Sequence, residues 1–229
     1  MLNIKIFKLI YKFIFSINIY INMLTDSQLE ELSKKMNIPL EGIYFKDELP
    51  RKLNYNKSYI INLEDAFNEK GEQNEGTHWT CLQVNKYKDG KVEPIFFDPY
   101  GAPPSEDIKK FVLDNTGKKL PHTTKDVQSL MNNACGWFCC AFLHYINNWD
   151  HRTHNLYDDV SCFLEYFDDL NKSIDFKKNE YILKMFFQAK DPKLRKEIEV
   201  ISNPNEIHDQ DEGKGLDIVK IPMDIKIMN

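Results

Sequence analysis

The 229-residue chain contains little glycine and proline, nine and ten residues respectively, and only three arginines against 27 lysines. This composition excludes collagen-like and low-complexity proteins, and an aromatic content of 13% excludes a chain that is disordered throughout. The net charge of −5 disfavours a protein that binds nucleic acid mainly through non-specific attraction. The sequence also has no internal repeat and no glycine-rich phosphate-binding loop. With 42% hydrophobic residues, it is long enough for one domain with a real core, or one domain with an appendage.

The apolar N-terminal segment, residues 1–22, has an uncharged stretch that is too short for a transmembrane helix. Its longest uncharged run extends from Phe13 to Thr25, whereas a spanning helix needs roughly 20 residues. No small-residue cleavage site follows it, which argues against a secretory signal. Two interpretations stay open: a basic, apolar helix lying at a membrane surface, or an upstream extension with translation starting at Met23. We expect the packed domain to span residues 23–200, followed by a polar tail over 201–229.

The five cysteines do not suggest a disulfide framework, because their number is odd and three of them fall within six residues. Cys139 and Cys140 are adjacent inside an apolar stretch, which is a poor geometry for disulfides. We therefore expect a reduced, intracellular protein with at least one thiol of functional interest. Cys81 and Cys162 are expected to be packing residues.

The hydrophobic pattern predicts an α+β fold. Helices are expected over residues 25–36, 105–115, 134–149, 157–170 and 176–189. Strands are expected over residues 58–63, 78–87 and 92–97, with one more within 118–130 and an added edge strand in the tail at 221–227. Residues 37–57 and 64–76 are expected to be irregular. Asp89-Gly90 predicts a tight hairpin between the second and third strands. Because the stretch 134–149 is apolar on nearly every side, it should form a buried central helix against a mixed or antiparallel sheet.

Two polar residues are predicted to meet at one end of this hairpin. His78 begins one strand and Asp98 ends its antiparallel partner, so the two side chains should lie side by side. A carboxylate beside an imidazole fixes its tautomer and stabilises its protonated form.

Cys135 is the candidate nucleophile, since it lies at the start of the predicted central helix, where the helix dipole favours a thiolate. Beside His78 it would form the thiolate–imidazolium pair of a cysteine peptidase. Gly136 would let a substrate backbone approach closely. Gln128, in the loop before the helix, could donate to a developing oxyanion together with the Cys135 N–H.

Taken singly, each of these residues has an ordinary structural interpretation as a strand histidine, a turn aspartate or a buried thiol. Cys139 and Cys140 are interpreted as core residues, because burial raises the pKa of a thiol and blocks access to it. A metal site made of Cys135, Cys139 and His144 lacks a fourth ligand and typical zinc spacing, so no metal is expected.

Four sequence features resemble the adenovirus endopeptidase (adenain-like) family. The segment 133–149, NACGWFCCAFLHYINNW, resembles its active-site helix, with the double cysteine, Phe-Leu-His and final Asn-Trp in the same order. Thr77-His78-Trp79 is similar to the family's His-Trp pair, and residues 97–101 (FDPYG) to its acidic-Pro-aromatic-Gly segment. Gln128 lies seven residues before the cysteine, as the family's oxyanion glutamine does. The resemblance covers residues 24–149.

The resemblance implies a cysteine endopeptidase of a virus, virophage or Maverick-type element that cleaves capsid or virion precursors near glycines during particle maturation. It implies Cys135 as nucleophile, His78 as general base and then acid, Asp98 as the residue that orients it, and Gln128 in the oxyanion hole. Trp79 would pack against the substrate site and shield it. The implied fold is that shared by adenain and the ubiquitin-like-protein peptidases. The implied location is the host cytoplasm, a virus factory or the virion, with a monomeric enzyme.

The sequence departs from adenain in its cofactor features. Adenain's activating peptide attaches through a cysteine between the acid and the nucleophile, and no cysteine occurs between Asp98 and Cys135. The net negative charge of the chain likewise gives no support for DNA as a cofactor. The sequence therefore does not indicate that the protein requires a cofactor. Asp98 stands where adenain has Glu, a replacement shared with the ubiquitin-like-protein peptidases.

Two other functions stay open at this point. One is a peptidase that deconjugates a ubiquitin-like modifier, which would use the same fold and triad on another substrate. The other, from a different class, is a virion interaction protein without turnover.

Overall fold

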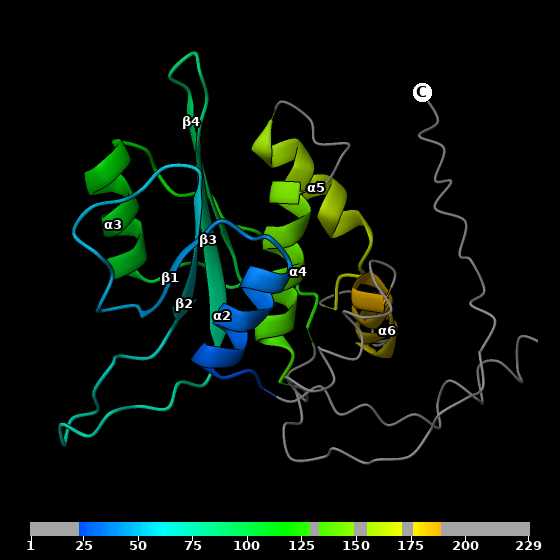
Figure 1. The fold of residues 1–229 in the computed structure, drawn as a ribbon, viewed down its shortest axis with the longest axis horizontal. Coiled ribbons are helices and arrows are strands. Elements are labelled where there is room, and N and C mark those ends of the chain that lie inside the picture. The colour runs from blue at the N-terminus through cyan, green and yellow to red at the C-terminus, as the bar shows by residue number, and fades with distance from the viewer. Residues whose placement is uncertain (1–22, 129–132, 149–154, 171–175, 189–229) are drawn as a thin grey trace, which may run out of the picture.

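The computed structural model describes residues 23–128, 133–148, 155–170 and 176–188 (Figure 1). They form an α+β structure with one mixed four-stranded sheet. Its strands are β1 (Leu40–Phe45), β2 (Lys57–Asn62), β3 (Trp79–Lys86) and β4 (Val92–Phe97). Its helices are α2 (Asp26–Lys35), α3 (Glu106–Thr116), α4 (Cys135–Asn148), α5 (Leu156–Glu165) and α6 (Phe176–Gln188). None of the helices in these ranges is long and apolar enough to span a bilayer.

The sheet has the strand order β1-β2-β3-β4. β1 and β2 run parallel, whereas β2, β3 and β4 are antiparallel to their neighbours. β3 and β4 form the predicted hairpin, in which Lys86 lies opposite Val92 and Cys81 opposite Phe97. Their register brings the start of β3 to the end of β4, where the polar residues were expected to meet.

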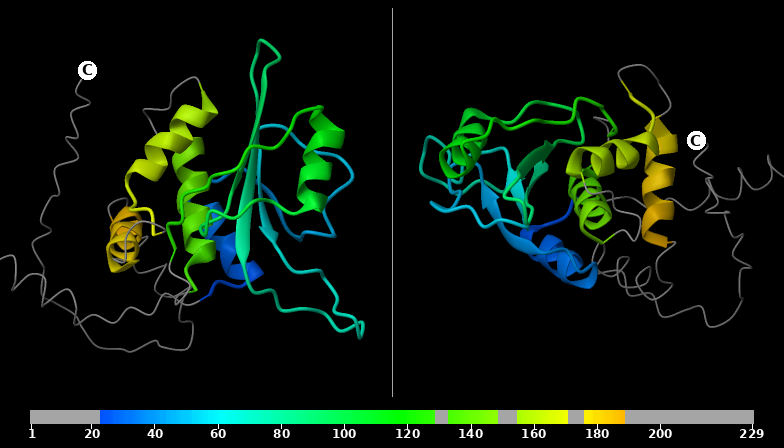
Figure 2. Two further views of the ribbon diagram at one scale, coloured as in Figure 1. Left: turned by 180° about the vertical axis from the view of Figure 1, so that it is seen from behind. Right: turned by 90° about the horizontal axis from the view of Figure 1, so that it is seen from above.

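The sheet is covered on both faces. In Figures 1 and 2, α3 lies alone on one face, and α2, α4 and α5 lie on the other with α6 outside them. The strand residues alternate between two hydrophobic clusters, as the period of two in a strand requires. Phe97 packs in the cluster beneath α4, and its neighbour Phe96 packs in the cluster beneath α3.

α4 is the centre of the larger cluster, because all of its residues from Cys135 to Ile146 are buried. Phe142 stacks on Phe97 of β4 with ring centroids 4.4 Å apart and planes within 6°. The neighbouring ring of Phe163 from α5 meets both at steep angles. A helix that is apolar all round can be stable only in such a position, which explains why its sequence shows so little amphipathic pattern.

Hydrogen bonds define the ends of two of the helices. The capping box is present at α2, where Thr25 accepts from the Gln28 N–H and the Gln28 side chain accepts from the Thr25 N–H. Ser105 caps α3, which ends at Gly117 in the left-handed conformation.

Two predictions about the sheet were wrong. Residues 37–57, expected to be irregular, contain β1, a strand of six half-buried residues that pairs with β2. The segment 118–128 forms no strand, only a single bridge between His122 and Phe96 at the edge of β4. The expected edge strand at 221–227 lies outside the described residues.

Candidate active site

His78 and Asp98 lie together at the end of the β3–β4 hairpin, as predicted. The Nε2 atom of His78 is 2.9 Å from Oδ1 of Asp98. The Asp98 side chain is 1% exposed and that of His78 is 14% exposed, so the pair is largely shielded from solvent. The same Asp98 oxygen accepts a hydrogen bond from the main-chain N–H of Tyr100 at 2.8 Å, which helps to fix the carboxylate.

The environment of His78 favours its protonated form. Burial lowers the pKa of His78, but the hydrogen bond to Asp98 and the nearby Cys135 thiol outweigh burial and raise that pKa to about 9. The buried Nδ1 atom makes no hydrogen bond of ordinary geometry within the described part of the chain. Since Nε2 is occupied by Asp98, Nδ1 is the nitrogen that remains for Cys135.

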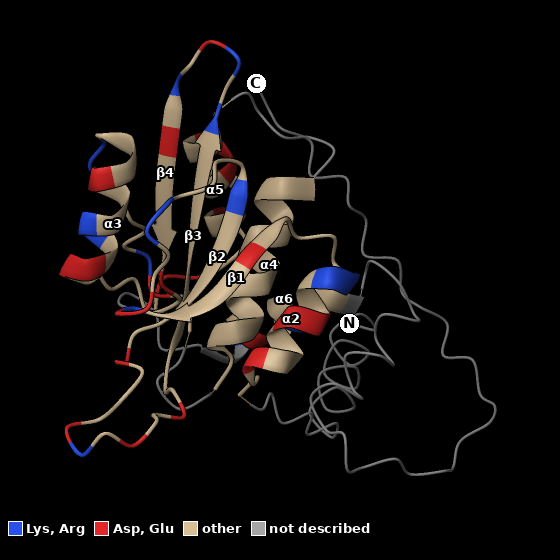
Figure 3. Cartoon of the chain, turned by 60° about the vertical axis from the view of Figure 1, so that its left-hand side comes forward, with Lys and Arg blue, Asp and Glu red and all other residues tan. Residues whose placement is uncertain are grey.

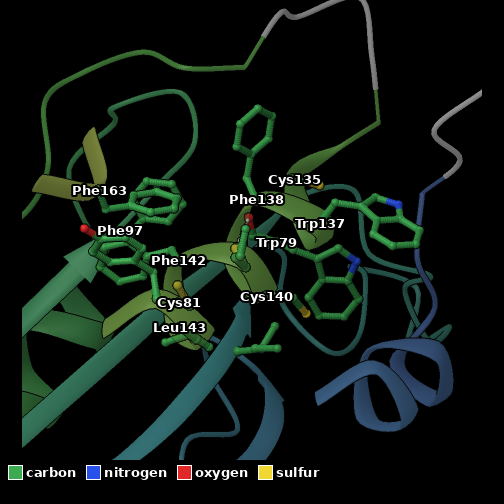
Figure 4. Packing of buried hydrophobic residues seen from close by; sticks show 14 of the residues in the cluster. Trp79, Cys81, Phe97, Cys135, Trp137, Phe138, Cys140, Phe142, Leu143 and Phe163 are labelled. Atoms are coloured by element: carbon green, nitrogen blue, oxygen red, sulfur yellow. Dashed lines mark hydrogen bonds between the residues drawn. The ribbon is translucent and has the colours of Figure 1, made fainter. Parts of the chain in front are cut away.

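Cys135 is the first residue of α4 and is buried. The residue before it, Ala134, accepts the first hydrogen bond of the helix, from Phe138 at 3.0 Å, and its side chain cannot act as a cap. The main-chain N–H of a first helical residue has no acceptor within the helix, so it can bind an anion there. Figure 4 shows Cys135 at this end of the helix, with Trp137 and Phe138 following it.

Gln128 is brought to the site by the turn that carries Asp98. The Pro99 carbonyl accepts from the N–H of Val127 at 2.8 Å and from that of Gln128 at 3.1 Å. The Gln128 side chain is buried, and its Nε2 donates to the Tyr100 hydroxyl at 3.2 Å. The structure therefore brings together His78, Asp98 and Gln128 through one short turn.

Trp79 and Gly136 occupy structural positions beside these residues. The Trp79 ring is buried and its Nε1 donates to the Leu24 carbonyl at 2.9 Å, which ties β3 to the start of α2. A Cβ on Gly136 would lie 3.0 Å from Leu29 and 3.4 Å from Leu24. The open side of Gly136 thus faces α2, and the structure gives a packing reason for glycine here, different from the expected approach of a substrate backbone.

The other cysteines differ in accessibility. Cys81, Cys139 and Cys140 are fully buried, and burial raises the pKa of each thiol, so these three are core residues as expected. The prediction for Cys162 was wrong, because its side chain is exposed on α5. Only one face of α5 packs in the larger cluster, through Leu156, Val160 and Phe163. Cys162 does not lie on this face.

No group of three or more His, Cys, Asp or Glu residues that could hold a metal ion is found in the described ranges. His144, considered above as a ligand, instead pairs through Nδ1 with the Met36 carbonyl at 2.7 Å and so links α4 to the end of α2.

The sequence reasoning missed Tyr100. Its ring stacks on the His78 imidazole, with centroids 4.5 Å apart and planes at 22°. Residues 97–101 were matched to the acidic-Pro-aromatic-Gly segment of the adenain-like family, but no role was assigned to the aromatic residue two positions after the acid.

The surroundings of the site carry negative charge. Figure 3 shows several acidic positions along the loop between β2 and β3, which ends directly at His78. One of them, Glu64, accepts a hydrogen bond from Thr77 at 3.0 Å, which holds the two ends of the loop together.

No protein-family model matches the sequence.

Proposed function

We propose that the protein is an adenain-like cysteine endopeptidase that cleaves capsid or virion precursor proteins, with Cys135 as nucleophile and His78 as general base. The observation that carries the proposal is the His78–Asp98 pair at 2.9 Å, with the Cys135 thiol close enough to raise the pKa of His78. A largely shielded imidazole with a carboxylate on one nitrogen and a thiol nearby has the composition of a nucleophile–base–orienter set.

In the proposed reaction, His78 takes the proton of the Cys135 thiol. The thiolate sulfur attacks the carbonyl carbon of the scissile peptide bond, and the carbonyl electron pair moves onto oxygen. The imidazolium then donates its proton to the leaving amine, the C–N bond breaks and a thioester remains on Cys135. Water, deprotonated by His78, attacks the thioester carbonyl and releases the acid product and the thiol.

The oxyanion formed in both steps would accept from the Cys135 main-chain N–H and from the Gln128 side-chain amide. The first donor is supported by the position of Cys135 at the start of α4. The second is supported by the burial of Gln128 and by its main-chain hydrogen bond to Pro99, next to Asp98. Loss of one such donor in a peptidase costs on the order of 100-fold in kcat or more.

The test is to incubate the purified full chain with capsid precursors encoded in the same genome and to sequence the new termini. Cleavage is expected with the native chain and none with the Cys135→Ala variant. Cys162→Ala is the matched control, because it removes an exposed thiol from α5 and should leave the rate unchanged. Equal cleavage by the Cys135→Ala variant would contradict the proposal.

The same preparation separates the alternatives. A modifier ending in Gly-Gly, fused to a reporter, would be released by a deconjugating peptidase, and capsid precursors would then stay intact. A protein without turnover would leave Cys135 unlabelled by iodoacetamide at neutral pH. The proposed enzyme should be labelled there, since its nucleophile has to react with an electrophile at neutral pH.

A further inference from the structure

Tyr100 is the one described residue that contacts the acid, the base and the glutamine of the proposed site. It lies two positions after Asp98 and donates its main-chain N–H to the Asp98 carboxylate at 2.8 Å. Its ring stacks on His78 at 4.5 Å, and its hydroxyl accepts from Gln128 at 3.2 Å. The ring contact and the hydroxyl contact use different parts of the side chain, so side-chain substitutions can separate them and leave the main-chain contact in place.

The stacking contact acts on the imidazole. A flat aromatic face lying over a ring restricts how that ring can turn, and it attracts the imidazolium more than the neutral imidazole. Asp98 acts on the same ring edge-on through Nε2. Together, the carboxylate and the phenol ring hold His78 in one orientation, with Nδ1 directed to the side left for Cys135.

The hydroxyl contact acts on Gln128. The main chain near Gln128 is already held by the Pro99 carbonyl. Gly101, in the left-handed conformation with φ of 70°, lies so close to Thr124 that a Cβ would come within 2.7 Å of its carbonyl oxygen. The turn and the glutamine loop are therefore in direct contact at both positions. Holding one side-chain N–H of Gln128 on the Tyr100 hydroxyl fixes the amide plane, and with it the direction of the second N–H.

We propose that Tyr100 is a positioning residue that couples the general base to the oxyanion hole: its ring holds His78, and its hydroxyl aims the Gln128 amide. The effect on turnover rests on the proposed peptidase function. The effect on His78 does not, because it can be measured on the histidine itself.

Two variants separate the two contacts. Tyr100→Phe keeps the ring and removes the hydroxyl; we expect kcat to fall about tenfold with little change in KM, through loss of one hydrogen bond to an oxyanion donor. Tyr100→Leu removes both contacts; kcat should fall further, and the pKa of His78 should fall by about one unit. The pKa is followed by NMR titration in the Cys135→Ala background, where the thiol does not titrate.

Tyr55 provides the matched control. Its hydroxyl also makes a hydrogen bond, to the Asn115 carbonyl at 3.3 Å, and its ring also lies beside a cation, Lys86 at 4.9 Å. The variants Tyr55→Phe and Tyr55→Leu should change neither kcat nor the pKa of His78.

The outcomes distinguish this inference from the proposed function. If Tyr100→Leu shifts the His78 titration while the native chain cleaves no substrate, the coupling to His78 stands and the peptidase assignment fails. If the native chain is active and Tyr100→Phe keeps full kcat, the aiming of Gln128 is refuted. An unchanged His78 titration in the folded Tyr100→Leu variant overturns the role of the ring.

Discussion

The difference in stability between the native protein and the Asp98→Asn variant should depend on pH, because only the native protein has the His78–Asp98 charge pair. The amide keeps an oxygen that can accept from the Tyr100 N–H, now at 2.8 Å; it loses the charge, and an NH2 group replaces the second oxygen. The pKa of His78 is raised from 6.5 to about 9 in the folded protein. At 1.36 kcal/mol per pKa unit, a shift of this size corresponds to roughly 3 kcal/mol of stability, of which Cys135 supplies a part.

The sign follows from the direction of the shift. A histidine whose pKa is raised on folding contributes stability that is fully present below its unfolded pKa of 6.5 and is lost as the pH rises through about 9. The Asp98→Asn variant should therefore be less stable than the native chain by roughly 2 kcal/mol at pH 6, and the difference should vanish by about pH 10. Above that pH, the native chain keeps a buried carboxylate without a cation, so the variant becomes the more stable of the two.

The assay is urea unfolding between pH 6 and 10 in the Cys135→Ala background, with the His78 titration followed by NMR on the same samples. Asp47→Asn is the control, because Asp47 accepts a main-chain N–H from Ala66 at 2.9 Å and bonds to no imidazole. Its stability difference should not change over this range. A difference between native and Asp98→Asn proteins that stays constant from pH 6 to 10 would refute the reasoning.

Three further predictions concern packing and access. Gly101→Ala should lower the free energy of unfolding in urea by about 2 kcal/mol or more, because φ is 70° and a Cβ would lie 2.7 Å from a main-chain oxygen. Gly90→Ala, where φ is also positive but no atom lies near the new Cβ, should lower it by only about 1 kcal/mol. Phe142→Ala should cost about 3–5 kcal/mol, since its fully buried ring stacks on another, whereas Leu113→Ala, at 50% exposure, should change stability by less than about 0.5 kcal/mol. Mass spectrometry after maleimide treatment should find Cys162 modified in the folded protein and the three core cysteines modified only in urea; early modification of the core thiols would contradict their burial.

The elements that could be predicted are those set by local rules. The Asp89-Gly90 hairpin and the apolar central helix each follow from a few neighbouring residues, and each is present. The meeting of His78 with Asp98 followed from the hairpin alone, since antiparallel pairing carries local register over to the ends of both strands.

The elements that were missed depend on distant partners. β1 has no alternation to detect, because all six residues are half-buried and it is defined by its pairing with β2. The strand expected within 118–130 is replaced over residues 118–128 by an irregular segment, which bonds to β4 only around Phe96. The exposure of Cys162 depends on how α5 is turned against α4, and the role of Tyr100 depends on a loop 28 residues away.

The β3–β4 hairpin has a consequence for engineering the chain. His78 and Asp98 lie at the open end of the hairpin, and the Asp89-Gly90 turn lies at the closed end, about 26 Å along the eight residues of β3. The ladder between these ends fixes the register of the pair independently of what connects the strands. An epitope tag or a small reporter domain inserted between Asp89 and Gly90 would therefore leave the acid–base geometry in place, and the turn offers a handle for attaching the protein to a surface.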